Sequence, residues 1–268
     1  MSKCKKERQL LCVEDLPAYE LVGTRDSHSP ILIVCDHASR KVPKVLRGLD
    51  IDGQYFEQHI GYDIGAAGVS RMLAERLNAT AVLAGFSRLV IDANRFLTAH
   101  DSIPSISDGV AIKGNERLTD IDKMLRVEEL FIPYHYEINR AISNIRQHFS
   151  MPLLMSVHSY TPVFQGFERP WEIGVLWEGD DGVASMLLDY LREHTRYHVG
   201  ENEPYHACNP IGYTVKTHAE TKGYPHILVE IRQDLIRDEK GQAEFASVFA
   251  NALEHIRNTL DQVLARRE

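Results

Sequence analysis

The sequence contains no apolar segment approaching the ~20 residues that a bilayer-spanning helix needs. It also has no basic run, and its net charge is −8. Nucleic acid and anionic membrane surfaces are therefore not expected as partners, because both require clustered Lys and Arg. The four cysteines show no CxxC and no regular spacing, and the N-terminus has no apolar stretch typical of a signal peptide. These absences favour a reducing cytoplasm and exclude a disulfide framework.

Several catalytic motifs are also missing. The chain has no GxSxG nucleophile elbow, no Walker-type phosphate loop, no HExxH and no GxGxxG. Nucleophilic serine chemistry therefore has little support. The 268 residues, 44% of them hydrophobic, suffice for a sizeable core. Because no repeat or linker divides them, we expect one domain over residues 1–268, with an N-terminal extension at 1–27 and a long loop at 97–118.

Short apolar runs alternate with segments of helical periodicity along the chain. The alternation predicts a three-layer α/β sandwich, with a central mixed, largely parallel sheet flanked by helices. Thr119 is a suitable N-cap for a long helix that Pro133 should kink or interrupt, and Asn78 is a plausible helix end. The expected strands are residues 30–35, 81–86, 88–92, 151–158, 172–178 and 226–232, and the expected helices are 65–78, 120–148, 183–194 and 241–266.

Four chemically capable side chains stand out against this pattern. His37, His158 and Glu230 come directly after apolar, β-branched runs, and Asp63 lies in the segment GYDIGA. The carboxyl ends of strands are where open α/β sheets collect their chemistry. Two histidines and a carboxylate, with a fourth position open, are typical of a catalytic zinc ion, and a further glutamate can act as base. The pattern favours a metal-dependent hydrolase.

Each of these residues also has a plainer interpretation. Asp63 precedes an expected helix and could cap its N-terminus, while His59 and Glu57 are nearby rivals as ligands. Glu230 could form an ion pair with Arg232 on the same strand face, and Arg232 is itself a candidate substrate-binding residue. A carboxylate inside the apolar run ILVEIR is costly to bury unless it is paired or used, and we favour its use as a base.

Further polar residues are candidates for binding substrate. Arg88, Asn94 and Arg95 cluster with Asp92 in SRLVIDANR, where a planar guanidinium could bind a substrate carboxylate through two hydrogen bonds. The alternative is a surface turn with solvated charges. His218, in GYTVKTHAETKG, could contact substrate or lie in a loop. Small polar neighbours, such as Asp36 beside His37, could orient the histidine rings.

Over residues 28–240 the chain resembles the N-formylglutamate amidohydrolase family. The resemblance rests on CDHAS, GYDIGA, SRLVIDANR, IKGNERL, SVHSY and GYPHILVEIRQDL, and SVHSY, EIR and ANR are more distantly similar to segments of zinc carboxypeptidases. It implies an α/β exopeptidase-like fold and one zinc ion, with Glu230 as base and Arg95 or Arg88 as partner of a substrate carboxylate. The implied ligands are His37, Asp63 and His158. Carboxypeptidases have a ligand Glu where this chain has Arg40, so Asp63 must supply the carboxylate.

The resemblance also implies a reaction, the hydrolysis of N-formyl-L-glutamate to formate and glutamate. The first motif reads CDHAS rather than Pro-His-Ser-Gly, which leaves another N-acyl amino acid open as substrate. Cobalt, manganese and iron suit the same ligands as zinc. The alternatives are a zinc carboxypeptidase, a deacylase of other N-acyl amino acids, whose pocket walls would come from segments 97–118 and 161–171, and a non-catalytic metal-stabilised binding protein.

Overall fold

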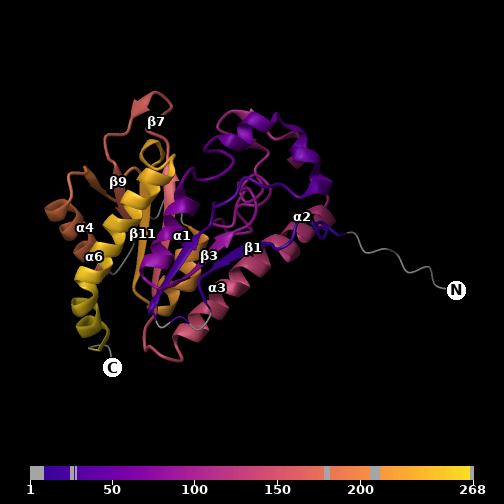
Figure 1. The fold of residues 1–268 in the computed structure, drawn as a ribbon. Coiled ribbons are helices and arrows are strands. Elements are labelled where there is room, and N and C mark those ends of the chain that lie inside the picture. The colour runs from indigo at the N-terminus through magenta and orange to yellow at the C-terminus, as the bar shows by residue number, and fades with distance from the viewer. Residues whose placement is uncertain (1–8, 25–26, 28, 178–181, 206–211, 266–268) are drawn as a thin grey trace.

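The computed structural model describes residues 9–24, 27, 29–177, 182–205 and 212–265, and its centre is a seven-stranded sheet (Figure 1). The strand order is β1-β3-β2-β6-β11-β9-β10. The pairs β1–β3 and β9–β11 are antiparallel and the other neighbours are parallel, which confirms a mixed, largely parallel sheet. The strands are β1 (Tyr19–Val22), β2 (Ile31–Cys35), β3 (Thr80–Ala84), β6 (Leu153–Tyr160), β9 (Ile173–Leu176), β10 (Val199–Glu201) and β11 (His226–Arg232).

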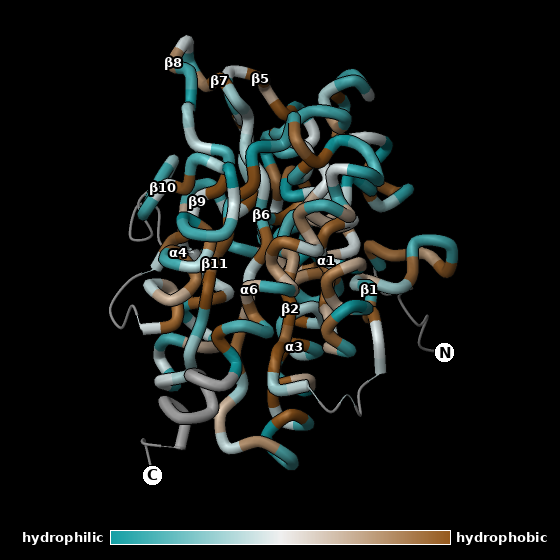
Figure 2. The backbone as a smooth tube through the Cα atoms, turned by 60° about the vertical axis from the view of Figure 1, so that its left-hand side comes forward, coloured by the Kyte–Doolittle hydropathy of each residue, from teal (hydrophilic) through white to brown (hydrophobic). Residues whose placement is uncertain are grey.

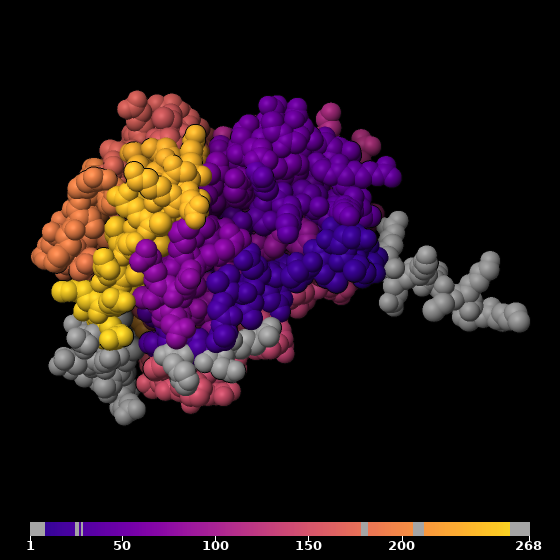
Figure 3. Space-filling view, viewed as in Figure 1, coloured from indigo at the N-terminus to yellow at the C-terminus, as the bar shows by residue number. Residues whose placement is uncertain are grey.

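Helices cover both faces of the sheet, as predicted. Because side chains alternate along a strand, Ile33 and Cys35 of β2 pack into one core while Leu32 and Val34 pack into the other. The first core is closed by α1 (Ala66–Arg76), α4 (Gly182–His194) and α6 (Glu239–Ala265), and the second by α3 (Ile132–Ile145) and α5 (Tyr213–His218). Figure 2 shows that β2 and β11 are largely hydrophobic, and Figure 3 shows α6, α4 and α1 forming a continuous surface.

Local sequence signals explain where several helices begin and end. Thr119 and Asp122 form a reciprocal capping box at the start of α2 (Asp120–Arg126). The predicted long helix is interrupted as expected: a π-helical turn (Val127–Phe131) follows α2, and Pro133 lies in the first turn of α3, where its missing N–H is tolerated. Asn78 adopts a left-handed conformation just after α1, which confirms it as the stop.

The structure corrects one predicted strand. Residues 88–90 form a turn and residues 91–92 have no regular structure. The Ser87 hydroxyl accepts the Leu89 N–H, and the Val90 N–H donates to the Ser87 carbonyl. Their apolar side chains are buried under a loop rather than in the sheet. A short apolar run does not distinguish these two kinds of burial.

The remaining segments are short and lie mostly at one end of the sheet. Within the predicted loop 97–118 a small hairpin forms from β4 (Ile106–Ser107) and β5 (Val110–Ala111), and a second hairpin, β7 (Val163–Phe164) with β8 (Phe167–Glu168), follows β6. Part of the expected extension, residues 19–22, is an edge strand of the sheet. None of the described helices is both long and apolar enough to cross a membrane. The 3₁₀ helices are Lys44–Asp50, Gly53–Glu57, Lys113–Asn115, Glu220–Lys222 and Gln233–Leu235.

The order of the strands reverses direction between β2 and β6. From β2 the chain passes through α1 to β3 on one side, and it later returns to β6 on the other side of β2. In open α/β sheets, ligands bind at the carboxyl ends of the two strands from which successive connections leave in opposite directions. The candidate residues predicted from the sequence lie together at the carboxyl ends of β2 and β6.

Candidate functional site

The two histidines lie at the carboxyl ends of β2 and β6. His37 follows β2 by two residues, and His158 lies inside β6, which continues to Tyr160 rather than ending at His158 as expected. The strands are parallel neighbours, so the imidazole rings approach to 5.1 Å between centroids. Both residues are buried, with 3% and 4% of their surface exposed. Burial at a strand end holds the rings in fixed positions.

Asp63 joins them from the loop before α1. Its backbone N–H donates to the His37 carbonyl, and its Oδ2 accepts the Ser159 N–H and lies 2.8 Å from His158 Nδ1 and 3.4 Å from His37 Nδ1. The helix cap that we considered for Asp63 does not form, because Gly65 occupies the N-cap position of α1. One potential ligand atom from each of the three residues lies within 4.8 Å of the others.

Gly65 fixes the turn that carries Asp63. Its φ of +82° is in the left-handed region, and a Cβ at this position would lie 2.1 Å from the Ile236 carbonyl oxygen. Only glycine therefore lets the loop approach the segment that follows β11 so closely.

A carboxylate lies against the far nitrogen of each histidine. Asp92 Oδ1 is 2.7 Å from His37 Nε2, and Asp36 Oδ2 is 3.3 Å from His158 Nε2. Asp36 is itself held by the hydroxyls of Tyr134 and Thr214, at 2.9 and 2.6 Å. Such outer carboxylates fix the tautomer and direction of metal-binding histidines, leaving each Nδ1 aimed at the shared centre. We had expected Asp36 to orient His37, and it faces His158 instead.

The charges of the group are strongly coupled. Burial alone would raise the pKa of Asp63, but the two histidines hold it below its ordinary value. Burial would likewise lower the pKa of His158, yet Asp36 and Asp63 raise it well above 6.5. The site thus favours positive charge at its centre even though it is shut off from water.

Glu230 stands beside His158 on the neighbouring strand. The two residues are directly paired in the parallel register of β6 and β11, so their side chains share one face of the sheet. Burial raises the pKa of Glu230 to about 7, against the lowering effect of His158. Its Oε2 is buried and has no hydrogen-bond partner in the described part of the chain. The proposed ion pair with Arg232 is absent, because Arg232 Nε donates to Asp234 at 2.9 Å.

These residues fit a divalent metal ion. Two imidazole nitrogens and one carboxylate oxygen are a common donor set for such ions, with further positions left for water and substrate. The cluster His37, Asp63 and His158 is buried, oriented by outer carboxylates and adjacent to the unpaired oxygen of Glu230. Such an arrangement can activate water next to a general base.

Comparison with known proteins agrees with this geometry. Residues 29–237 match the sequence model of the N-formylglutamate amidohydrolase family. The chain belongs to this family. Membership supports hydrolysis of an amide bond, the chemistry for which the family is named. A search of curated proteins found no match.

Two crystal structures resemble this family member. A gene product of Agrobacterium tumefaciens, Atu2144, is 28% identical and superposes with a TM-score of 0.89, and the alignment covers 94% of this chain and all of that one. The N-formylglutamate amidohydrolase of Ralstonia eutropha JMP134 is 16% identical with a TM-score of 0.61, over the same shares of both chains. The second likeness is one of fold alone.

Of the predicted substrate-binding residues, Arg88 contacts the candidate metal site of this family member. Its Nη2 bonds to Asp92 Oδ2 at 2.7 Å, and its Nη1 lies 3.3 Å from His37 Nδ1 and 3.7 Å from Asp63 Oδ1. Arg95 is bonded instead to Asp101 at 2.8 Å. The assignment of a substrate carboxylate to either arginine stays a prediction.

The other candidates have protein partners. Asn94 accepts the Thr214 N–H, Arg232 is bonded to Asp234, and His218 is buried against His135. The rival ligands also lie elsewhere: Glu57 forms an ion pair with Arg40, and His59 lies 3.3 Å from Asp108.

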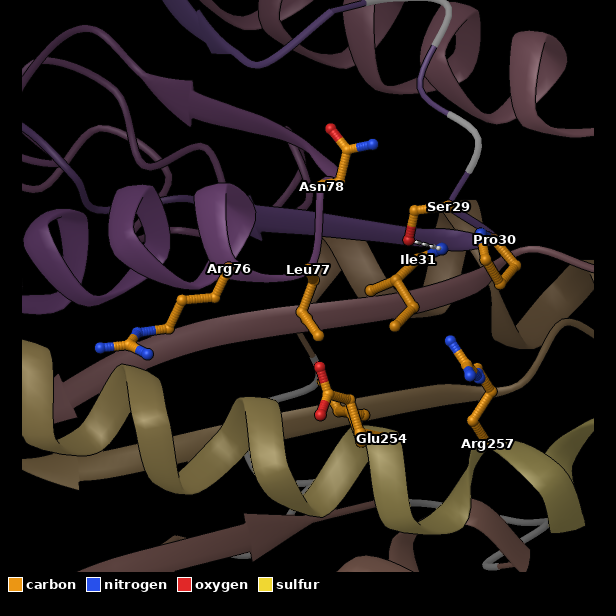
Figure 4. Close-up of a pocket in the computed structure, with 9 residues that line it drawn as sticks. Ser29, Pro30, Ile31, Arg76, Leu77, Asn78, Glu254 and Arg257 are labelled. Atoms are coloured by element: carbon orange, nitrogen blue, oxygen red, sulfur yellow. Dashed lines mark hydrogen bonds between the residues drawn. The ribbon is translucent and has the colours of Figure 1, made fainter.

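A pocket lies at the opposite end of the sheet. Ser29 to Ile31 at the start of β2, the end of α1 and one turn of α6 line it, and the side chains of Arg76, Glu254 and Arg257 surround its opening (Figure 4). Because His37 follows the other end of β2, this pocket is separate from the candidate metal site.

Proposed function

We propose that this protein hydrolyses the amide bond of an N-acyl amino acid, N-formyl-L-glutamate, with a divalent metal ion, zinc as the first choice, held by His37, Asp63 and His158. The observation that carries the proposal is the buried His–Asp–His group with the free carboxylate oxygen of Glu230 beside it. The products would be formate and glutamate. Family membership supports the reaction class.

Each residue has a role that its surroundings support. A divalent metal bound here would supply Lewis acidity at the acyl group and acidify a nearby water molecule. Glu230 accepts the proton of the attacking water and returns it to the leaving amine nitrogen, for which a pKa of about 7 is suitable. The Arg88 guanidinium faces the ligand atoms of His37 and Asp63, where it can stabilise negative charge that develops on the acyl oxygen.

The unpaired Glu230 also argues against a binding protein that lacks catalysis. Burying a carboxylate without a partner is costly, and a binding protein gains nothing from it. A zinc carboxypeptidase or a deacylase of larger acyl groups would share the metal site and differ in the pocket walls. Activity towards different substrates distinguishes these alternatives from the proposed function.

The test is formate release from N-formyl-L-glutamate by zinc-loaded protein, with a chelated sample and N-acetyl-L-glutamate as controls. Chelator-sensitive release, faster for the formyl than for the acetyl substrate, is the expected result. No release with one zinc bound per chain would discard this substrate, and turnover that survives complete metal removal would discard the mechanism.

The base assignment is tested with Glu230→Gln. The amide keeps the shape of the side chain but cannot accept the proton, so turnover should fall by about 10²–10⁴. Metal content, measured by atomic emission on the same sample, should stay at the wild-type level. Near wild-type turnover by this variant would remove Glu230 from the mechanism.

A further inference from the structure

Arg169 is buried in a cage of aromatic rings. It follows the β7–β8 hairpin, which projects above the end of the sheet (Figures 1 and 2), and only 6% of its surface is exposed. Its guanidinium carbon lies 4.7 Å from the ring centre of Tyr205, 4.8 Å from that of Phe164 and 5.5 Å from that of Tyr160. We call these three rings the Arg169 cage. Cation–π contact of this kind holds a guanidinium in place but does not neutralise its charge.

This guanidinium lacks an anionic partner. Its Nη1 donates to the Tyr205 hydroxyl at 2.9 Å and to the Thr161 carbonyl at 3.4 Å. Within the described part of the chain its Nε and Nη2 form no hydrogen bond, and no carboxylate oxygen lies within 4.0 Å of it. In contrast, Arg88, Arg95 and Arg232 are each bonded to an aspartate. A buried charge without a counter-charge is costly, and a bound anion would remove that cost.

The Arg169 cage adjoins the candidate metal site. Tyr160 lies two residues beyond His158 on β6, so both side chains project from the same face, about 6.6 Å apart along the strand. The guanidinium lies over the Tyr160 ring, and the Tyr205 ring lies 6.5 Å from that of Tyr160 between ring centres. Arg169 therefore lies against the end of β6, the strand that carries His158.

We propose that Arg169 binds the side-chain carboxylate of the substrate amino acid and so makes the site selective for a dicarboxylic one. This inference rests on the proposed function. Because His158 and Tyr160 are neighbours on one face of β6, a substrate with its scissile amide at His158 would extend its distal carboxylate towards the cage. The unpaired Nε and Nη2 form the edge of the guanidinium that grips both carboxylate oxygens. Arg88 is too close to the ligand atoms for this role and is bonded to Asp92.

The kinetic test compares an acidic substrate with its neutral isostere. In Arg169→Met, kcat/KM for N-formyl-L-glutamate should fall by about tenfold to hundredfold through KM, while kcat/KM for N-formyl-L-glutamine stays within about twofold. Arg169→Lys should recover part of the preference for the acidic substrate, because lysine restores the positive charge but not the two parallel hydrogen bonds of a guanidinium. Arg196→Met is the matched control: Arg196 also stacks on a tyrosine, but on the surface and bonded to Glu244. An equal loss on both substrates would overturn the proposal.

A binding measurement separates this inference from the proposed reaction. Calorimetric titration with glutarate, which has two carboxylates and no scissile bond, needs no turnover. Wild-type protein should bind glutarate, and Arg169→Met should bind it at least about tenfold more weakly, with an unchanged circular dichroism spectrum. If glutarate binds both proteins equally, or binds neither, Arg169 is not the anchor, even where formate release succeeds. If the titration behaves as expected and no formate is released, the reaction assignment fails and the anchor stands.

Discussion

Two pairs of buried histidines show how the surroundings of a histidine determine whether its ring is protonated or neutral. His37 and His158 lie 5.1 Å apart between ring centres, and so do His135 and His218. Burial lowers the pKa of His135 to about 4 and that of His218 to about 3. Burial acts on His37 and His158 in the same direction, yet their pKa values are raised.

Neighbouring carboxylates account for the difference. Asp36, Asp63 and Asp92 face the first pair, and they make a positive charge favourable at its centre. The second pair is bonded to the Ala93 carbonyl and the Asn139 side chain, and burial, the larger effect there, favours the neutral rings. The surroundings of the first pair therefore favour a bound cation, and those of the second pair favour neutral rings.

The largest effect should come from removing a ring of the first pair. His158→Ala should reduce bound zinc from one per chain towards zero and abolish metal-dependent turnover, because two ligands remain. His135→Asn should keep its zinc, since His135 contacts no ligand residue. Metal content of the dialysed proteins by atomic emission measures both. Equal zinc retention in the two variants would contradict the conclusion that only the first pair binds the metal.

A smaller effect should follow from neutralising an outer carboxylate. Asp92→Asn leaves all three ligands in place but weakens the hold on His37 Nε2, so zinc affinity should fall by about 10–100-fold. Competition with a chromogenic chelator gives the affinity. Asp101→Asn is the control, because Asp101 is bonded to Arg95 rather than to a histidine. An unchanged affinity in Asp92→Asn would mean that Asp92 does not orient the ligand.

The second pair should be visible in the acid stability of the protein. Because its folded pKa values lie below the unfolded value of about 6.5, its contribution is complete above that pH and is lost as pH falls towards 4 and 3. Between pH 7 and pH 5 each histidine should cost about 2 kcal/mol of unfolding free energy. Urea titrations of wild type and His218→Asn at both pH values measure this, and the variant should lose about 2 kcal/mol less. An equal loss in both proteins would show that His218 is not buried neutral.

The sequence predicted the sheet, its covering helices and the three ligand candidates, because each depends on a local pattern. Apolar runs such as residues 30–35 report burial directly, and a polar side chain just beyond such a run falls at a predictable edge. The roles of Asp92 and Arg169 depend on which distant segments meet. Asp92 is 55 residues from the ring that it orients, so no spacing reveals it. Arg169 gave no signal beyond its place in the connection 161–171, since an arginine near aromatic residues is common on surfaces.

The strand at residues 88–92 was predicted wrongly because an apolar run indicates burial but not backbone conformation. Its apolar side chains are buried, as the pattern indicated, but residues 88–90 form a turn, in which the Ser87 hydroxyl accepts the Leu89 N–H. Because the backbone turns here, the side chains of Arg88 and Asp92, which are four residues apart in sequence, bond to each other beside His37. An extended strand would have kept them farther apart.

Gly65 packs the loop that carries the candidate ligand Asp63 against the segment that follows β11, the strand that carries Glu230. Asp63 lies two residues before Gly65, and the backbone at Ile236, against which Gly65 packs, lies six residues after Glu230. An added methyl group here would push the two segments apart at once. The folded backbone itself therefore fixes where the loop with the ligand Asp63 lies relative to the segment that follows the strand with the base, and no bound substrate is needed for this contact.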